Sequence, residues 1–140
     1  MVEIHVERTL EVPAQRVWEA LRSFEGIETY LPMIARSEVR GSGAGAVRVC
    51  TTQDGGSIQE RLESLDDAAM RLVYTIVDGP MPIEDYRSTM HVRAAGDERC
   101  TVSWSCTFEA APEAAEELRG MFTGVYTDGL AGLEKVHAAR

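Results

Sequence analysis

Apolar and polar residues alternate from Val2 to Val12, so that nearly every second side chain is hydrophobic. This period of two is typical of a strand with one buried face. Pro13 then suits the first turn of a helix, and apolar residues recur at helical spacing until a break at Glu25-Gly26. The pattern therefore predicts a half-buried strand followed by a short helix.

A second short helix is expected from Ile27 to Ile34, a segment that is apolar and aromatic around a central Pro32. Six further strands follow, each bounded by turns rich in glycine and aspartate. Their expected ranges are near 36–41, 46–53, 57–65, 69–78, 83–94 and 99–109. Such closely spaced strands favour an antiparallel sheet.

A long helix is expected from Pro112 to about Ala139. Apolar residues at spacings of three and four indicate one buried face, made of Leu118, Met121, Phe122, Val125, Tyr126, Leu130 and Leu133. The same helix contains Gly120, Gly124, Gly129 and Gly132. Each glycine costs a helix about 1 kcal/mol relative to alanine. We therefore expect close packing against the sheet or a helix that bends, with an unconstrained surface helix as the alternative.

The order of these elements predicts an α+β fold of the helix-grip type. A curved seven-stranded antiparallel sheet wraps around the long C-terminal helix, and two short helices follow the first strand. No repeat or change of composition marks a second domain, so residues 1–140 are expected to form a single one. A strongly twisted sheet curls, and one helix across its concave face leaves space beneath it. We therefore expect an internal pocket for a mostly apolar small molecule.

Glu60 is a polar residue that the alternation places on the inner face of its strand, together with Ile58 and Leu62. Burying a carboxylate is costly unless it is hydrogen-bonded or neutralised, and burial without a partner raises the pKa of such a group. Glu60 is therefore a candidate functional residue. The alternative is a hydrated carboxylate at the rim of the sheet.

Three further strands present aromatic and hydroxyl-bearing residues on the same face. They contribute Leu72, Tyr74 and Ile76, then Tyr86, Ser88, Met90 and Val92, and finally Val102, Trp104, Cys106 and Phe108. Apolar walls with a few polar anchors are typical of a ligand pocket. A solid core, in which the tyrosine hydroxyls pair with backbone groups, is the alternative.

The charge and composition of the chain argue against several classes of partner. The formal net charge is -9 without a cluster of Lys or Arg, which disfavours nucleic acid. The longest apolar stretches are far shorter than the roughly 20 residues of a membrane span. Three cysteines without metal-site spacing, and the lack of a signal peptide before the first strand, favour a reducing cytoplasm. We expect a monomer or a homodimer.

Metal and nucleophile chemistry find no support in the pattern. The alternation points His5 and His91 outward, away from any inward carboxylate or cysteine, so no metal site is expected. Ser88 has neither a nucleophile elbow nor an inward histidine. The glycines of 41–45 lie between strands rather than before a helix, so they do not form a phosphate cradle. No cofactor is expected.

Several short motifs follow one another along nearly the whole chain. They are Val12-Pro13-Ala14 to Trp18, Tyr30-Leu31-Pro32, Glu60-Arg61-Leu62 with Asp66-Asp67, Gly79-Pro80-Met81-Pro82, Tyr86-Arg87-Ser88 and Trp104 to Phe108. In this order they resemble the START-related, Bet v 1-like (SRPBCC) superfamily, and most of all its branch of polyketide cyclases, dehydrases and lipid-transport proteins. The resemblance implies a helix-grip fold with a hydrophobic ligand in its cavity.

The stretch from Glu60 to Val92 is also similar to the plant abscisic acid receptors of this superfamily. That resemblance implies that Glu60, Tyr86 and Ser88 line the ligand cavity. A matching Met-Phe pair on the last helix, here Met121-Phe122, implies a roof over the pocket that consists of Phe122, Tyr126 and Leu130.

The departures from the receptors change the expected ligand. Leu31 stands where the receptors carry a lysine that pairs with the ligand carboxylate. Their gate and latch segments are replaced by 53–57 and 81–83, so hormone-gated phosphatase inhibition is not expected. With Glu60 as the only charge placed inside, the pocket is expected to prefer neutral or hydroxylated ligands over carboxylates.

Three hypotheses about function remain open. The first is a binder or carrier of a hydrophobic small molecule (polyketide, lipid or isoprenoid-like), and the second is a polyketide cyclase, aromatase or dehydratase with Glu60 as general acid/base and Tyr86 stabilising an enolate. The third is a protein-interaction module, for which no exposed apolar patch is evident. The residues expected to bind the ligand are Tyr30, Leu31, Glu60, Leu62, Tyr74, Ile76, Tyr86, Ser88, Met90, Trp104, Phe122, Tyr126 and Leu130.

Overall fold

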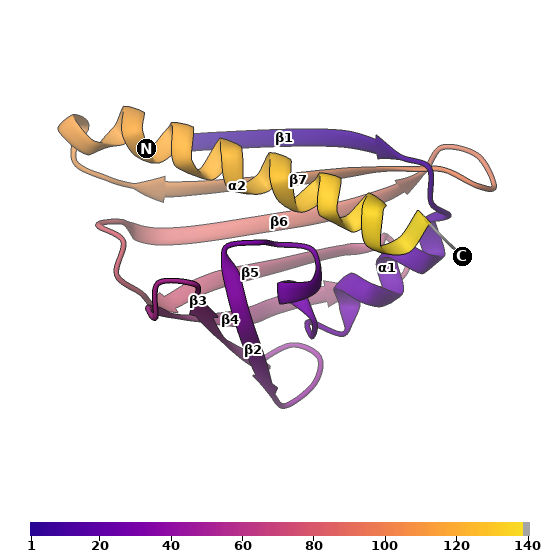
Figure 1. Cartoon of the computed structure of the whole chain (residues 1–140), viewed down its shortest axis with the longest axis horizontal. Helices are drawn as coiled ribbons and strands as arrows, with labels where there is room; N and C mark the ends of the chain where they lie inside the picture. The colour runs from indigo at the N-terminus through magenta and orange to yellow at the C-terminus, as the bar shows by residue number, and fades with distance from the viewer. Residues whose placement is uncertain (139–140) are drawn as a thin grey trace.

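The computed structural model describes residues 1–138, which contain one sheet and two α-helices (Figure 1). The strands are β1 (Val2–Leu10), β2 (Ile34–Arg40), β3 (Val47–Thr52), β4 (Ser57–Asp66), β5 (Arg71–Asp78), β6 (Glu84–Ala94) and β7 (Cys100–Glu109). The helices are α1 (Ala14–Arg22) and α2 (Pro112–Ala138), with one 3-10 turn, η1 (Ile27–Thr29), between α1 and β2.

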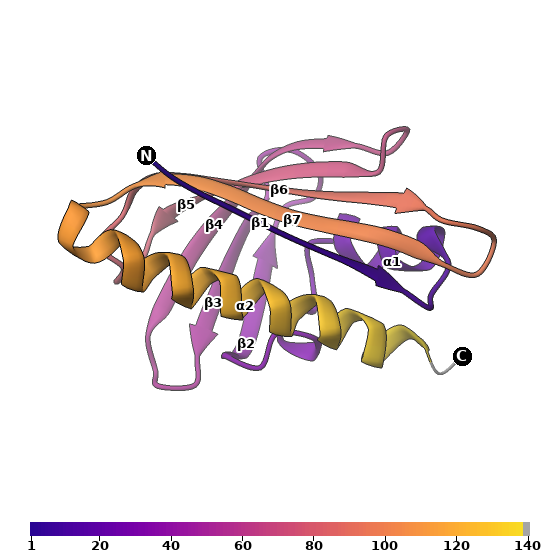
Figure 2. The ribbon, with the colours of Figure 1, turned by 90° about the horizontal axis from the view of Figure 1, so that it is seen from above.

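The strands of the described residues form one seven-stranded antiparallel sheet in the order β1-β7-β6-β5-β4-β3-β2. The sheet curls, and α2 runs along one of its faces (Figure 2). Because β1 and β2 lie at opposite edges, the connection through α1 and η1 has to cross one end of the sheet. The opposite end carries the β5–β6 connection and the first turns of α2 (Figure 1).

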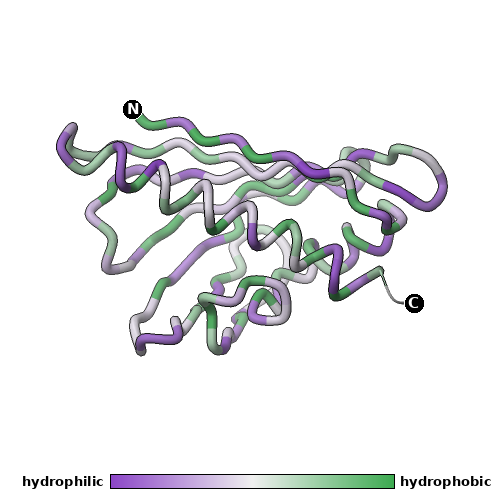
Figure 3. Tube along the Cα trace, turned by 45° about the horizontal axis from the view of Figure 1, so that its top comes forward, coloured by the Kyte–Doolittle hydropathy of each residue, from purple (hydrophilic) through white to green (hydrophobic). Residues whose placement is uncertain are grey.

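Side-chain alternation explains why these segments are strands. Burial along β7 alternates from Cys100 to Phe108, and along β1 Val2 and Ile4 are buried while their neighbours are exposed. Hydropathy alternates along β1 in the same way (Figure 3). An antiparallel sheet with one face on a helix and one face in water requires this pattern. The predicted curved, seven-stranded sheet with a long C-terminal helix is confirmed.

The second short helix expected over 27–34 is wrong in kind and extent. The structure has only η1 there, and Ile34 already begins β2. Gly26 enters η1 with a left-handed φ of 77°. Pro32 has no N–H with which to continue a helix, and it disfavours helical backbone at the residue before it. The chain therefore turns once and leaves as a strand.

Asp67, in the turn between β4 and β5, ties α1 to the sheet. Trp18 Nε1 donates to Asp67 Oδ1 at 2.9 Å, and the Arg22 guanidinium donates to both carboxylate oxygens at 2.7 and 3.1 Å. The hydrogen bond from Arg22, followed by that from Trp18, lowers the pKa of Asp67. Val17 and Leu21 of α1 are buried in the same region, so this end of the sheet is filled by side chains.

The buried face of α2 is largely the predicted one, since Leu118, Phe122, Tyr126, Leu130 and Leu133 are all buried. Val125 is only half-buried, and Met121 has 39% of its surface exposed. The predicted end near Ala139 lies outside the described residues. Neither helix within residues 1–138 carries an apolar stretch long enough to cross a membrane.

The four glycines of α2 divide into two pairs. A Cβ added at Gly129 would lie 2.6 Å from Trp104 Cζ3, and one added at Gly132 would overlap the backbone carbonyl of Tyr30. A Cβ at Gly120 or Gly124 would meet nothing within 4 Å. Close packing therefore explains Gly129 and Gly132, which let the last turns of α2 approach the sheet and η1. Gly120 and Gly124 are not constrained by packing.

Candidate functional site

A cavity of about 330 Å³ lies between the sheet and the first half of α2. Its mouth is formed by Gln53 and Asp54 of the β3–β4 turn, Pro80 and Met81 of the β5–β6 connection, and Met121 of α2. Pockets for small molecules have volumes of roughly 300–1,000 Å³ and mostly apolar walls. The cavity is thus a ligand-sized pocket at the small end of that range.

Many of the predicted ligand-binding residues line this cavity, namely Leu31, Glu60, Tyr74, Ile76, Tyr86, Trp104, Phe122 and Tyr126. The other predicted residues are buried but do not line it, and they are Tyr30, Leu62, Ser88, Met90 and Leu130. Their alternation is right, because they lie on the inner side of the sheet and of α2. They belong to the packed core rather than to the walls of the cavity.

Sequence reasoning missed a further set of wall residues: Ile27, Met33, Ile34, Cys50, Thr52, Gln53, Asp54, Ile58, Pro80, Met81, Met121 and Val125. The sequence pattern places Ile58 on the inner face of its strand, and Met121 and Val125 on the inner stripe of the helix, without assigning them to the ligand. Most of the others lie at strand ends and in turns, where alternation gives no direction. The replaced gate and latch segments do reach the mouth, through Gln53, Asp54 and Met81.

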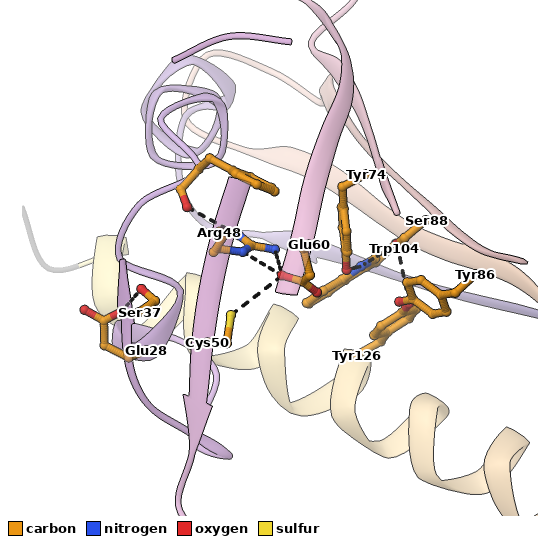
Figure 4. Close-up of polar contacts among 11 residues, drawn as sticks. Glu28, Ser37, Arg48, Cys50, Glu60, Tyr74, Tyr86, Ser88, Trp104 and Tyr126 are labelled. Carbon is orange, nitrogen blue, oxygen red and sulfur yellow. Dashed lines mark hydrogen bonds and ion pairs between the residues drawn. The ribbon is translucent and has the colours of Figure 1, made fainter. Parts of the chain in front are cut away.

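A buried ion pair joins β3 to β4 at the wall of the pocket. The two strands place Arg48 directly opposite Glu60, and Glu60 Oε1 lies 2.7 Å from Arg48 Nε and 2.6 Å from Nη2 (Figure 4). The side chains are 4% and 9% exposed. The expectation that Glu60 is the only inward charge is therefore wrong, because Arg48 neutralises it.

Aromatic rings enclose the Arg48 guanidinium on its other sides. Its central carbon lies 3.9 Å from the centroid of the Phe24 ring and 5.3 Å from that of Tyr74, which are cation–π distances. Phe24 has a left-handed φ of 64°, and its carbonyl accepts a hydrogen bond of 3.5 Å from Arg48 Nη1. Burial opposes the charge, but the attraction of Glu60 and the neighbouring tyrosines outweighs it and raises the pKa of Arg48.

Cys50 lines the cavity beside the ion pair. Its Sγ donates to Glu60 Oε1 over 3.7 Å (Figure 4). Burial, followed by the negative charge of Glu60, raises the pKa of the thiol to about 12. A thiol that stays protonated is a poor nucleophile, so Cys50 acts as a weak hydrogen-bond donor to the carboxylate.

The second carboxylate oxygen of Glu60 is open to the cavity. All hydrogen bonds to Glu60 from residues 1–138 go to Oε1. Every enclosed polar side-chain atom in this part of the chain has a hydrogen-bond partner, so Oε2, which has none, cannot be enclosed. Glu60 itself is 7% exposed and lines the pocket. Oε2 is therefore an acceptor that a bound molecule can reach.

A cluster of hydroxyls forms the second polar feature. Trp104 Nε1 donates to Tyr74 Oη and to Ser88 Oγ, each at 3.1 Å, and Ser88 Oγ donates to the Ser105 carbonyl at 3.0 Å. The Tyr126 hydroxyl lies 3.4 Å from Ser88 Oγ and is bonded to the Tyr86 hydroxyl (Figure 4).

The cluster contradicts the alternative in which the tyrosine hydroxyls of a solid core pair with backbone groups. The tyrosine hydroxyls pair with other side chains rather than with the backbone, and Trp104 stacks on Tyr126 with ring centroids 4.3 Å apart. Burial raises the pKa of all three tyrosines, Tyr74, Tyr86 and Tyr126. The phenols therefore stay neutral at physiological pH.

Covalent and metal chemistry have few candidate groups in this pocket. The sequence contains one lysine, Lys135, which is exposed in the last turn of α2 and does not line the cavity. Among residues 1–138 no three His, Cys, Asp or Glu side chains converge to hold a metal ion. The polar groups of the cavity wall are Glu60, Cys50, the tyrosine cluster and, at the mouth, Thr52, Gln53 and Asp54.

A curved sheet that grips a long helix over an apolar cavity defines a ligand-binding class of helix-grip proteins. The chain belongs to the family described as polyketide cyclase / dehydrase and lipid transport, whose model matches residues 1–138. The resemblance to the Bet v 1-like superfamily drawn from the sequence motifs is therefore confirmed.

Three relatives show how far the similarity extends. The abscisic acid receptor PYL7 of Arabidopsis thaliana is 31% identical over 87 residues, which are 59% of this chain and 41% of the receptor. The chain thus matches less than half the length of that relative. The solved structure of XoxI from Bacillus cereus has a TM-score of 0.89 at 29% identity, covering 99% of this chain and 97% of XoxI. The solved structure of a protein from Thermobifida fusca has a TM-score of 0.87 at 33% identity, covering 98% of this chain and 93% of that protein.

Proposed function

We propose that this protein binds or carries a neutral, mostly apolar small molecule, such as a polyketide, a lipid or an isoprenoid-like compound, in the cavity beneath α2. The observation that supports this most is a ligand-sized apolar cavity whose inner wall carries Glu60 Oε2, an acceptor without a partner among residues 1–138. Burial of the apolar body supplies affinity, and the polar group fixes orientation. The three free, buried cysteines support action in a reducing compartment such as the cytoplasm.

The charges around the cavity favour a neutral ligand. Arg48 and Glu60 cancel each other, and Arg48 stands behind Glu60 without lining the cavity. A ligand carboxylate would meet the Glu60 oxygen before it could reach the guanidinium. Two like charges in a desolvated site repel strongly. Carboxylates should therefore bind more weakly than neutral molecules of the same shape.

The alternative is an enzyme of the cyclase, aromatase or dehydratase type in the same cavity. It draws support from the same free Oε2, which could act as a general base. Two observations favour the carrier. No lysine lines the cavity to form a Schiff base, and the Cys50 thiol is held protonated. Turnover of a polyketide substrate by the wild type that a Glu60→Gln variant loses would favour the enzyme instead.

Native mass spectrometry of the purified protein, followed by titration with a panel of polyketide, isoprenoid and lipid compounds, tests the proposal. We expect one ligand per chain. Val125→Trp fills the cavity from α2 and should abolish binding, whereas Thr123→Trp lies on the exposed side of the same helix and should preserve it. Failure of every compound to bind the wild type, or equal binding by Val125→Trp, would overturn the proposal.

A further inference from the structure

The donor and the acceptor of each hydrogen bond in the tyrosine cluster can be assigned by starting at Ser88. The Ser105 carbonyl can only accept, so it takes the single hydroxyl proton of Ser88. The indole N–H of Trp104 can only donate, so Ser88 Oγ and Tyr74 Oη both accept from it. Ser88 therefore has no proton left for Tyr126.

The direction of the outer bonds follows from this. In the 3.4 Å contact with Ser88 Oγ, Tyr126 can therefore only be the donor. In the contact between Tyr86 and Tyr126, Tyr86 is then the donor. Tyr74 Oη accepts from Trp104. The hydroxyl protons of Ser88, Tyr126 and Tyr86 each have an acceptor inside the protein.

The polar groups around Glu60 likewise leave an acceptor, and not a donor, for a bound molecule. Paired with Arg48, Glu60 is a carboxylate, and a carboxylate can only accept hydrogen bonds. The S–H of Cys50 is directed at Oε1. Away from the mouth, where Gln53 and Asp54 lie, the wall therefore offers oxygen lone pairs to a bound molecule. In this inner part of the wall, Oε2 is an acceptor that has no partner within residues 1–138.

From these hydrogen bonds we infer that the pocket selects ligands that carry a hydrogen-bond donor. A hydroxyl, phenol or N–H group on an otherwise apolar body bonds Glu60 Oε2, and analogues with an ether or a ketone at that position are rejected. Such analogues leave a desolvated carboxylate oxygen facing another acceptor. This inference rests on the proposed function and names the chemical class of its ligand.

Matched pairs of compounds on two scaffolds test the inference on the wild-type protein. The pairs are 2-naphthol with 2-methoxynaphthalene, and farnesol with farnesyl methyl ether, titrated by isothermal calorimetry. On each scaffold that binds, the alcohol should bind at least about tenfold more tightly than its ether. An ether that binds as tightly as its alcohol overturns the inference and leaves the proposed function intact. Failure of both scaffolds and of the lipophile panel overturns both.

A Glu60→Gln variant supplies a second readout. Arg48 would hold the amide oxygen at the position of Oε1, which directs the amide N–H group into the cavity in place of Oε2. The preference for 2-naphthol over 2-methoxynaphthalene should then fall to near one or reverse. Glu63→Gln on the same strand, on the half-buried opposite face, is the matched control and should keep the preference. Circular dichroism establishes first that both variants fold, and an unchanged preference in a folded Glu60→Gln protein contradicts the inference.

Discussion

Arg48 and Glu60 face each other across β3 and β4 in an ion pair of 2.6 Å, inside a core that leaves 4% and 9% of their side chains exposed. The pair removes a charge from the wall of the cavity without removing its hydrogen-bonding capacity, because only Oε1 is used. Desolvating two ions is expensive, and the aromatic rings around Arg48 recover part of that cost. This arrangement makes a buried carboxylate available to a neutral ligand.

Removing one partner of this pair should be far worse than removing both. Arg48→Met leaves Glu60 as an unpaired buried charge, and we expect it to lower the free energy of unfolding by about 3–5 kcal/mol. The double variant Arg48→Met/Glu60→Leu should recover most of that loss, because buried ion pairs are often replaced by apolar groups without penalty. Urea unfolding followed by tryptophan fluorescence measures the wild type, the single variants Arg48→Met and Glu60→Leu, and the double variant. Losses that simply add would show that the two residues are not coupled.

The contribution of Asp67 to the stability of the folded protein should depend on pH in the acid range. The hydrogen bonds from Arg22 and Trp18 lower its pKa in the folded protein below the unfolded value of about 3.9. Its stabilising contribution is therefore present above that value and is lost as the pH falls through the folded pKa. The urea midpoint of the wild type should drop more between pH 7 and pH 3 than that of Asp67→Asn.

Asp97→Asn, in the exposed β6–β7 turn, is the control for this pH series and should behave like the wild type. Parallel pH dependences of the wild type and Asp67→Asn would mean that the contacts of Asp67 with Arg22 and Trp18 contribute nothing measurable to folding.

Cys50 should be nearly inert while the protein is folded. Its pKa of about 12, raised first by burial and then by Glu60, leaves roughly a thousandfold less thiolate at pH 8 than an exposed cysteine has. Iodoacetamide labelling at pH 8 with peptide mass mapping should show almost no modification of Cys50 in buffer and rapid modification in urea. Fast labelling of Cys50 in the folded state would disprove the protonated thiol beside Glu60.

The sequence pattern predicted which face of each strand is buried, but not which buried side chains line the cavity. Period-two patterns identified the strands because one side of the sheet meets water, and the same patterns placed Glu60, Tyr74 and Tyr86 inside. They could not separate cavity wall from core, so Leu62 and Met90, which lie on the correct face, were expected to contact the ligand. That distinction depends on which part of the interior α1 fills, which is a tertiary property.

Arg48 shows why the central charge pair escaped prediction. In β3, Val47 and Val49 are apolar and occupy one face, while Arg48 shares the other face with Cys50. Hydrophobicity alone therefore assigns Arg48 to the wrong side. The usable signal was the hairpin register, which sets Arg48 opposite Glu60, because opposite charges directly across two strands stabilise the pair.

The glycines of α2 allow a direct test of how the helix is held over the cavity. Gly120 and Gly124 have open space around them, so Gly124→Ala should raise the free energy of unfolding by about 0.5–1 kcal/mol through helix propensity alone. Gly132→Ala would push a methyl group into the carbonyl of Tyr30, and Gly129→Ala would displace Trp104. Both should destabilise the protein, by about 1–3 kcal/mol for overpacking of this kind.

Thermal and urea unfolding of the three alanine variants separates the two explanations for these glycines. If all three were stabilised alike, the close approach of α2 to η1 and Trp104 would not exist in solution. If Gly124→Ala stabilises the protein and also weakens ligand binding, the first half of α2 has to bend for the ligand to enter. If it stabilises the protein and leaves binding unchanged, the cavity is reached past the turns at Gln53 and Met81 without movement of the helix.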